Sequence, residues 1–211
     1  GFKTAKTDHT GSLYRLYDSS RNALIHTKDL LNNTISFYNS DSYEISDPNN
    51  DNIWYKSELN GSRYMALDVH WGLQKIYDRL YNTHNKSSFD DNGGEIDAYV
   101  RAMLYDGSYL TRDNACFAYY DNKPLFFFGM GEDIFKPLAS LDVVAHEFGH
   151  AITHYQIGWL SAQRFLNEGL SDIWGAIMDY RYGDSQTEVW KTGEQILLSN
   201  SVNRVRDLAD P

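Results

Sequence analysis

The hydrophobic positions divide the chain into two regions with different periodicities. Residues 1–140 carry short apolar runs separated by Tyr, Asn, Ser, Asp and Gly, a pattern typical of β-strands and long loops. One segment of this region, roughly Arg63 to Tyr81, has a helical period instead. The apolar positions that are predicted to face the core are Met65, Val69, Leu73, Ile76, Tyr77 and Leu80.

Three further segments of the first region are predicted strands. Alternating residues from Ile96 to Leu104 indicate a strand with one buried face. Ala115 to Tyr120 and Leu125 to Met130 flank the turn sequence Asp121-Asn122-Lys123-Pro124, so they are predicted to form a hairpin.

Beyond residue 140 the pattern becomes helical. Apolar spacing predicts helices from Leu141 to about Gln156 and from about Arg164 to Tyr182. The predicted fold class is α+β. A β-rich N-terminal domain with one long helix (residues 1–140) is followed by helices in residues 141–211 that begin a helical C-terminal domain.

The first of these helices contains the run His146-Glu147-Phe148-Gly149-His150. A helix advances about 100° per residue, so positions four apart lie on one face. Two imidazoles on that face can bind one metal ion from the same side, and Glu147 can reach a water on that ion. The apolar flanks predict a mostly buried helix, and a buried histidine pair needs partners or a metal. The run therefore predicts a zinc hydrolase site.

The second helix begins with Asn167-Glu168-Gly169-Leu170-Ser171-Asp172. Glu168 is a candidate third ligand, which would complete a His₂Glu set with the fourth position open for water. Asp172 lies one turn further along the same face. There it can accept a hydrogen bond from a ligand imidazole and fix the tautomer of that ring.

The two motifs together, H-E-x-x-H followed by N-E-x-x-S-D, resemble the thermolysin-like zinc metallopeptidases of the thermolysin, pseudolysin and vibriolysin type. Asp142 to Ala145 before the first histidine is similar to the family's sequence there. The same holds for Asn114 to Phe117, Val205-Arg206 and Ala66 to Trp71. The likeness covers most of the chain and is weakest before about Asn50.

The resemblance implies a role for each of the matched residues. It implies that His146, His150 and Glu168 hold zinc, that Glu147 is the general base and that Asp172 orients a ligand histidine. It also implies that a peptide substrate adds to the edge strand near Asn114. The substrate contacts are then the side chain of Asn114, the carbonyl of Ala115 and the guanidinium of Arg206, which also meets Asp172.

The same resemblance implies calcium beside the zinc helices. Asp142, Asp179 and Glu194 match three of the family's calcium positions. Glu188 and Asp184 lie nearby, although an insertion blurs their match. Ca²⁺ binds several oxygen ligands at once, so a cluster of carboxylates suits it.

The chain departs from the family in three places. Ser161 stands where a tyrosine that stabilises the oxyanion is expected, and His150 and Glu168 are closer in sequence than usual. The family's second oxyanion donor, a histidine, falls beyond residue 211. The C-terminal helical domain is therefore expected to be truncated or supplied by a separate chain, such as the protein's own C-terminal fragment. His154 is interpreted as a structural residue or as a neighbour of the ligands.

The composition of the chain limits the kinds of partner that it can bind. The formal net charge is −10, which argues against nucleic acid and anionic membranes, whereas excess carboxylate suits calcium. A single cysteine, Cys116, excludes an internal disulfide. No sequence resembles a transmembrane span or a signal peptide. The resemblance implies a secreted, zymogen-derived enzyme that acts on proteins or peptides.

Three functions remain open at this point. The first is a zinc-dependent endopeptidase with Glu147 as general base. The second is a zinc aminopeptidase, because Asn167-Glu168-Gly169 and the short ligand spacing resemble that group. The third is a non-catalytic binding module stabilised by its metal, which the missing oxyanion donors favour and the intact Glu147 opposes.

Overall fold

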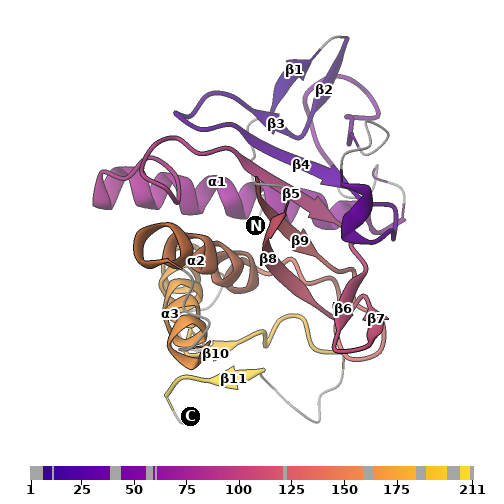
Figure 1. Cartoon of the computed structure of the whole chain (residues 1–211). Coiled ribbons are helices and arrows are strands. Elements are labelled where there is room, and N and C mark those ends of the chain that lie inside the picture. Colours follow the sequence, from indigo (N-terminus) through magenta and orange to yellow (C-terminus); the bar gives the residue numbers. More distant parts are fainter. Residues whose placement is uncertain are drawn as a thin grey trace.

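The computed structural model describes residues 7–10, 12–38, 44–55, 59, 61–120, 123–158, 164–183, 189–198 and 205–209. Its largest element is a five-stranded sheet with the order β3-β4-β5-β9-β8 (Figure 1). The three central strands are parallel to one another, and β8 runs antiparallel to β9 at the sheet edge. The strands are β3 (Tyr17–Asp18), β4 (Ile25–Asp29), β5 (Ile96–Val100), β8 (Ala115–Tyr120) and β9 (Lys123–Phe128).

The structure also has three two-stranded sheets and two short 3₁₀ helices among the described residues. The pairs are β1 (Asp8–Thr10) with β2 (Leu13–Arg15), β6 (Leu104–Asp106) with β7 (Tyr109–Thr111), and β10 (Lys191–Thr192) with β11 (Arg206–Asp207). The 3₁₀ turns are η1 (Ile35–Phe37) and η4 (Gly61–Tyr64).

Three helices follow the predicted positions closely. They are α1 (Met65–His84), α2 (Leu141–Ile157) and α3 (Arg164–Tyr182). The first runs three residues further than its apolar pattern predicted. It ends where Asn85 adopts a left-handed conformation (φ 53°), and the N–H of Asn85 bonds the carbonyls of Leu80 and Tyr81. The α+β fold class is confirmed.

The sheet separates two hydrophobic clusters. One face of β5 and β9, with Ala98 and Phe126, packs against α1 and α2 to form the main core. The opposite face, with Tyr99 and Phe127, packs against a smaller cluster that includes Tyr38. Neighbouring residues of a strand point to opposite faces, so both faces of the central strands are covered.

The prediction for the strand at Ile96 was wrong in burial and length. All five residues of β5 are buried, and the strand ends at Val100 rather than Leu104. Parallel strands with both faces covered do not alternate between buried and exposed side chains. Arg101 then turns the chain with φ 53°.

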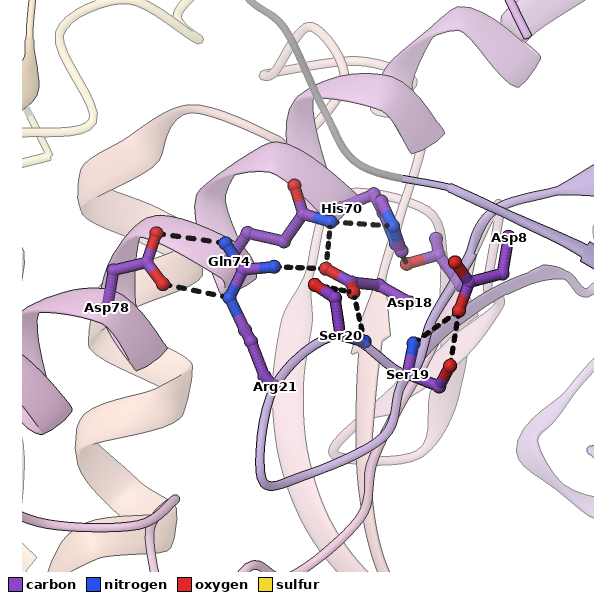
Figure 2. Close-up of polar contacts among 9 residues, drawn as sticks. Asp8, Asp18, Ser19, Ser20, Arg21, His70, Gln74 and Asp78 are labelled. Carbon is purple, nitrogen blue, oxygen red and sulfur yellow. Dashed lines mark hydrogen bonds and ion pairs between the residues drawn. The ribbon is translucent and has the colours of Figure 1, made fainter.

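A buried polar network fastens the β3–β4 connection to α1 (Figure 2). Asp18 is fully buried, and its carboxylate accepts a hydrogen bond from Gln74 Nε2 at 2.6 Å. It also pairs with Arg21, whose guanidinium donates two bonds to Asp78 at 2.8 and 2.9 Å. Gln74 Nε2 lies 3.2 Å from His70 Nε2. A buried carboxylate is tolerated when it is paired and hydrogen-bonded, so this network holds the first strands against α1.

Candidate metal centre and substrate cleft

The predicted zinc motifs meet because α2 and α3 pack as a close antiparallel pair. Gly149 of α2 faces Ser171 of α3, where an added Cβ would lie 2.8 Å from the Ser171 Cα. Gly175 of α3 faces the carbonyl oxygen of Asp142, which would lie 2.9 Å from its Cβ. Two glycines at the contact let the helix backbones approach, which brings the start of α3 to the H-E-x-x-H face of α2.

Two histidines and one glutamate converge at this contact. Glu168 Oε2 lies 3.3 Å from His146 Nε2, and Glu168 Oε1 lies 3.8 Å from His150 Nε2. Their ligand atoms all fall within 4.8 Å of one another. Ligand bonds of about 2.0–2.2 Å at tetrahedral angles require separations of roughly 3.3 Å. The two distances from Glu168 to the imidazoles are near this separation, so the three residues are candidate ligands for one zinc ion, which would leave a fourth position for water.

A second layer of contacts orients both imidazoles. Asp172 Oδ1 lies 2.8 Å from His146 Nδ1, as the sequence predicted. Ser171 Oγ lies 3.0 Å from His150 Nδ1, a contact that the sequence analysis missed. Ser171 follows Glu168 by three positions and so shares its helix face, which could have identified it. Both histidines then present Nε2 towards Glu168, which is the orientation that metal binding requires.

Arg206 joins this layer from β11. Its Nη2 donates to Asp172 Oδ1 at 2.5 Å and lies 3.3 Å from His146 Nδ1. The predicted contact between Arg206 and Asp172 is therefore present. Arg206 is 60 positions from His146 in sequence, so this contact depends on the path of the chain after α3.

The surroundings of His146 favour positive charge. Burial alone would lower its pKa, but hydrogen bonds with Asp172 and Glu168 and the charge of Glu147 raise the pKa of His146 to about 9. The hydrogen bond with His146 lowers the pKa of Glu168. An environment that stabilises a proton on this imidazole also stabilises a divalent cation at the same nitrogen.

Glu147, the candidate general base, lies between the ligand helix and the sheet edge. Its side chain is buried, and its Oε2 accepts the backbone N–H of Phe117 at 2.8 Å. This bond leaves the other carboxylate oxygen for a second partner. It also fixes the base relative to β8, since Phe117 belongs to that strand.

The edge strand β8 forms one wall of a cleft of about 880 Å³. The two histidines, Glu147 and Glu168 line this cleft, together with Asn114, Ala115 and Arg206. An apolar part is formed by Phe135, Leu138, Val143 and Ile196. Asn114 Oδ1 accepts the N–H of Ala115 at 2.9 Å, so this side chain caps the start of β8.

Three of the predicted calcium residues come from three segments, Asp142 from α2, Asp179 from α3 and Glu194 from the turn after β10. Asp142 and Asp179 are buried. Asp142 Oδ2 accepts the N–H of Gly193 at 2.6 Å. Burial, followed by the charges of Asp142 and Asp179, raises the pKa of Glu194 to about 7. The charges of Asp142 and Asp179 therefore act on Glu194, although among the described residues the group that meets the criterion for a candidate metal cluster is His146, His150 and Glu168.

The other positions that the sequence analysis singled out are Ser161, Asp184, Glu188 and His154. Ser161, Asp184 and Glu188 lie outside the described residues. His154 lines the cleft and packs its ring 5.3 Å from Tyr119, and burial lowers its pKa. Among the described residues, no helix is long and apolar enough to cross a membrane.

An antiparallel helix pair with a His₂Glu cluster, beside a glutamate and the edge strand of a sheet, defines a metallopeptidase architecture. Residues 1–154 match the family described as thermolysin metallopeptidase, catalytic domain, and the chain belongs to this family.

Relatives and a solved structure agree with this assignment. The chain is 34% identical to bacillolysin of Brevibacillus brevis, over 99% of this chain and 35% of that protein. It is 32% identical to neutral protease B of Bacillus subtilis strain 168, over 97% of this chain and 35% of that protein. The precursor of protealysin from Serratia proteamaculans shares the fold, with a TM-score of 0.65 at 19% identity, covering 90% of this chain and 54% of that chain. The chain thus spans about a third of the length of these curated relatives.

Proposed function

We propose that the chain forms the catalytic centre of a zinc-dependent endopeptidase that hydrolyses proteins or peptides. The observation that carries this proposal is the convergence of His146, His150 and Glu168 beside the carboxylate of Glu147. Because the chain spans about a third of its relatives, the activity and substrates of the whole protein belong to the proposal. The secreted location implied by the family resemblance likewise remains a prediction.

Zinc would be held by the three clustered ligands, where it supplies a polarised carbonyl and a bound water with a pKa of about 7. Asp172 and Ser171 keep the ligand imidazoles in place through their Nδ1 atoms. Glu147 takes a proton from the attacking water and passes it to the leaving amine. The bond from Phe117 N–H holds one of its oxygens, so the carboxylate keeps a fixed orientation during that transfer.

The substrate would bind as an added strand along β8. Among the described residues this strand is the last of the sheet and pairs with β9. Apart from the Phe117 N–H that binds Glu147, its other edge can pair with an extended peptide. Asn114 and Ala115 stand at the start of that edge, and Arg206 projects into the same cleft. The apolar part of the cleft suits a large apolar side chain next to the scissile bond.

Calcium would bind between Asp142, Asp179 and Glu194. The support is electrostatic, because these carboxylates raise the pKa of Glu194 to about 7 and a divalent cation would relieve their repulsion. Glu194 Oε2 is buried without a hydrogen-bond partner, which leaves it available as a ligand. Glu188, outside the described residues, is a further candidate.

A helical segment would cover the outer face of α3, either from the rest of a longer chain or from a separate one. Leu166, Ile173 and Tyr180, which lie on one face of this helix, are 52%, 50% and 58% exposed. Exposed apolar side chains of this size on one helix mark a surface that is normally covered. This proposal keeps the division between residues 1–140 and 141–211, with the second part as the start of a helical domain.

The test combines metal analysis with two variants. Wild-type protein should bind one equivalent of zinc and cleave a peptide that is blocked at both ends, because an endopeptidase needs no free amine. Glu147→Gln should keep the zinc and lose at least about 100-fold in kcat, since a general base contributes that much or more. His146→Ala should lose the zinc.

The alternatives give different results. Cleavage of unblocked peptides alone would indicate an aminopeptidase. Bound zinc without turnover of either peptide would indicate a binding module. Unchanged activity in Glu147→Gln would refute the assigned base.

A further inference from the structure

The loop that carries Phe135 and Leu138 of the apolar part of the cleft is anchored to a single carboxylate. Asp113 Oδ1 accepts the backbone N–H groups of Glu132 at 2.6 Å and Phe135 at 3.2 Å. Asp113 Oδ2 accepts those of Asp133 at 2.8 Å and Ile134 at 3.0 Å. Four successive N–H groups therefore converge on one side chain. Because one carboxylate accepts these four backbone N–H groups, it holds the whole turn in place, whereas a single hydrogen bond would hold one residue.

Two further backbone hydrogen bonds connect this loop to the segment before β8 and to the segment that contains Ile196. On one side, Gly131 N–H donates to the carbonyl of Arg112 at 3.0 Å. On the other side, Lys136 N–H donates to the carbonyl of Ile196 at 2.6 Å. Gly131 has φ 76°, and an added Cβ there would lie 2.0 Å from the carbonyl oxygen of Phe135, so the turn is tightly closed.

The anchor lies directly beside the substrate edge. Asp113 precedes Asn114, and β8 begins at Ala115. The carbonyl of Asn114 in turn accepts the N–H of Gly129 at 2.9 Å, which binds the start of β8 to the start of the loop. Movement of the loop would thus move Phe135 relative to the strand on which a peptide is proposed to bind.

We propose that Asp113 is a positioning residue that sets the apolar selectivity of the cleft by holding Phe135 against the substrate edge. The proposal rests on the proposed function and deepens it, because it names the residue that places the selecting wall. The charge state supports the geometry. Burial alone would raise the pKa of Asp113, but the bonds from the four loop N–H groups outweigh it and hold the pKa below its ordinary value.

The experiment measures peptide affinity separately from turnover. Zinc-loaded protein in a Glu147→Gln background is titrated with two doubly blocked peptides that differ by Leu or Ala after the scissile bond. The parent should bind the Leu peptide about tenfold more tightly, since an apolar pocket discriminates by this factor or more. Asp113→Asn should reduce the preference below about threefold, because an amide cannot accept all four N–H bonds.

Matched variants separate positioning from a general loss of structure. Asp133→Asn makes the same charge change in the same loop, at an exposed side chain, and should keep the parent's preference. Phe135→Ala should lose the preference with the anchor intact. Hydrogen exchange should show faster exchange of the loop amides in Asp113→Asn and parent rates in Asp133→Asn.

Two outcomes would overturn the proposal. One is an unchanged Leu preference in Asp113→Asn, and the other is a parent that has no such preference. If wild-type protein cleaves neither peptide while Asp113→Asn still changes the affinity ratio, the proposed function fails and the role of Asp113 stands. If wild-type protein cleaves both and the ratio stays unchanged, the reverse holds.

Discussion

Asp172 contacts two cationic or potentially cationic groups at once, His146 and Arg206. Burial alone would raise its pKa, but these hydrogen bonds lower the pKa of Asp172, so the carboxylate stays charged at neutral pH. A charged, hydrogen-bonded carboxylate beside a ligand histidine fixes the ring and increases its basicity. At the residue scale, the candidate site therefore depends on the side chains that hydrogen-bond the candidate ligands as well as on those ligands.

Removing the charge of Asp172 should weaken metal binding. Asp172→Asn should lower zinc affinity by about 10–100-fold, the usual cost of losing such a partner. A competition titration with a zinc chelator would measure it. Asp106→Asn, at an exposed carboxylate of β6 that bonds Tyr109, serves as the control and should leave the affinity unchanged. Equal affinities for Asp172→Asn and wild type would show that Asp172 does not support the ligand.

At the element scale, the site depends on how closely α2 and α3 pack. The candidate ligands come from both helices, so the distance between the helix axes sets the separation of Glu168 from the histidines. Gly149 has no room for a Cβ against Ser171, whereas Gly169 of α3 has no atom within 4 Å of an added Cβ. The two positions provide a matched pair of helical glycines.

Gly149→Ala should force the helices apart. We expect a loss of about 1–3 kcal/mol in the free energy of unfolding, the usual cost of overpacking, together with weaker zinc binding. Gly169→Ala should keep or increase stability by up to about 1 kcal/mol, because alanine is the better helix former. Chemical denaturation of both variants measures the difference. A Gly149→Ala variant as stable as Gly169→Ala would contradict the packing argument.

The calcium proposal joins three elements, α2, α3 and the turn after β10, and it has a pH signature. The pKa of Glu194 is raised from 4.5 to about 7. A carboxyl with a raised pKa contributes stability below its unfolded pKa, and this contribution is lost as the pH rises through about 7. Calcium-free, zinc-loaded protein should therefore lose stability between pH 5 and 8.

Calcium should reverse that loss in the wild type but not in Glu194→Gln. At a calcium concentration 100 times the Kd, the expected gain is about 2.7 kcal/mol. Glu194→Gln should be more stable than calcium-free wild type at pH 8, because it lacks the buried charge, and should gain nothing from calcium. Thermal unfolding at both pH values tests this. An equal calcium response in wild type and variant would exclude Glu194 as a ligand.

At the scale of the whole molecule, the outer side of α3 exposes several large apolar side chains. Leu166, Leu170, Ile173, Ile177 and Tyr180 follow one another at intervals of three and four residues and so form one stripe along the helix. Ile173 and Tyr180 are 50% and 58% exposed. A stripe with this spacing is suited to pack against another helix.

The isolated chain should therefore self-associate as its concentration rises. Leu166→Ser combined with Ile173→Ser should shift it towards monomer, because the two changes remove apolar surface from the stripe. Sedimentation or light scattering over a concentration series measures this. Tyr105→Ser combined with Tyr109→Ser, on the exposed β6–β7 hairpin, is the control and should not change the association. A wild-type monomer at all concentrations would count against a missing cover.

The helices and the clustering of the candidate ligands were predictable because their signals are local. Apolar spacing marked α3 at its observed ends, Arg164 and Tyr182, and placed His146 and His150 on one face of α2. Glu168 and Asp172 were predictable from their spacing and from the likeness to a family. In each case a few neighbouring residues carry the pattern, and helix geometry converts their spacing directly into direction.

Contacts between distant segments required the tertiary structure. Spacing along the chain does not reveal that Phe117 N–H would meet Glu147, or that Asp113 would collect four N–H groups from a loop about 20 positions away. The same limit explains the error at β5, whose burial depends on parallel neighbours far away in sequence. Local periodicity shows which face of a single helix or strand is apolar. The packing of the elements decides which surface covers the other face of a strand or helix. It also decides which backbone group reaches a given side chain.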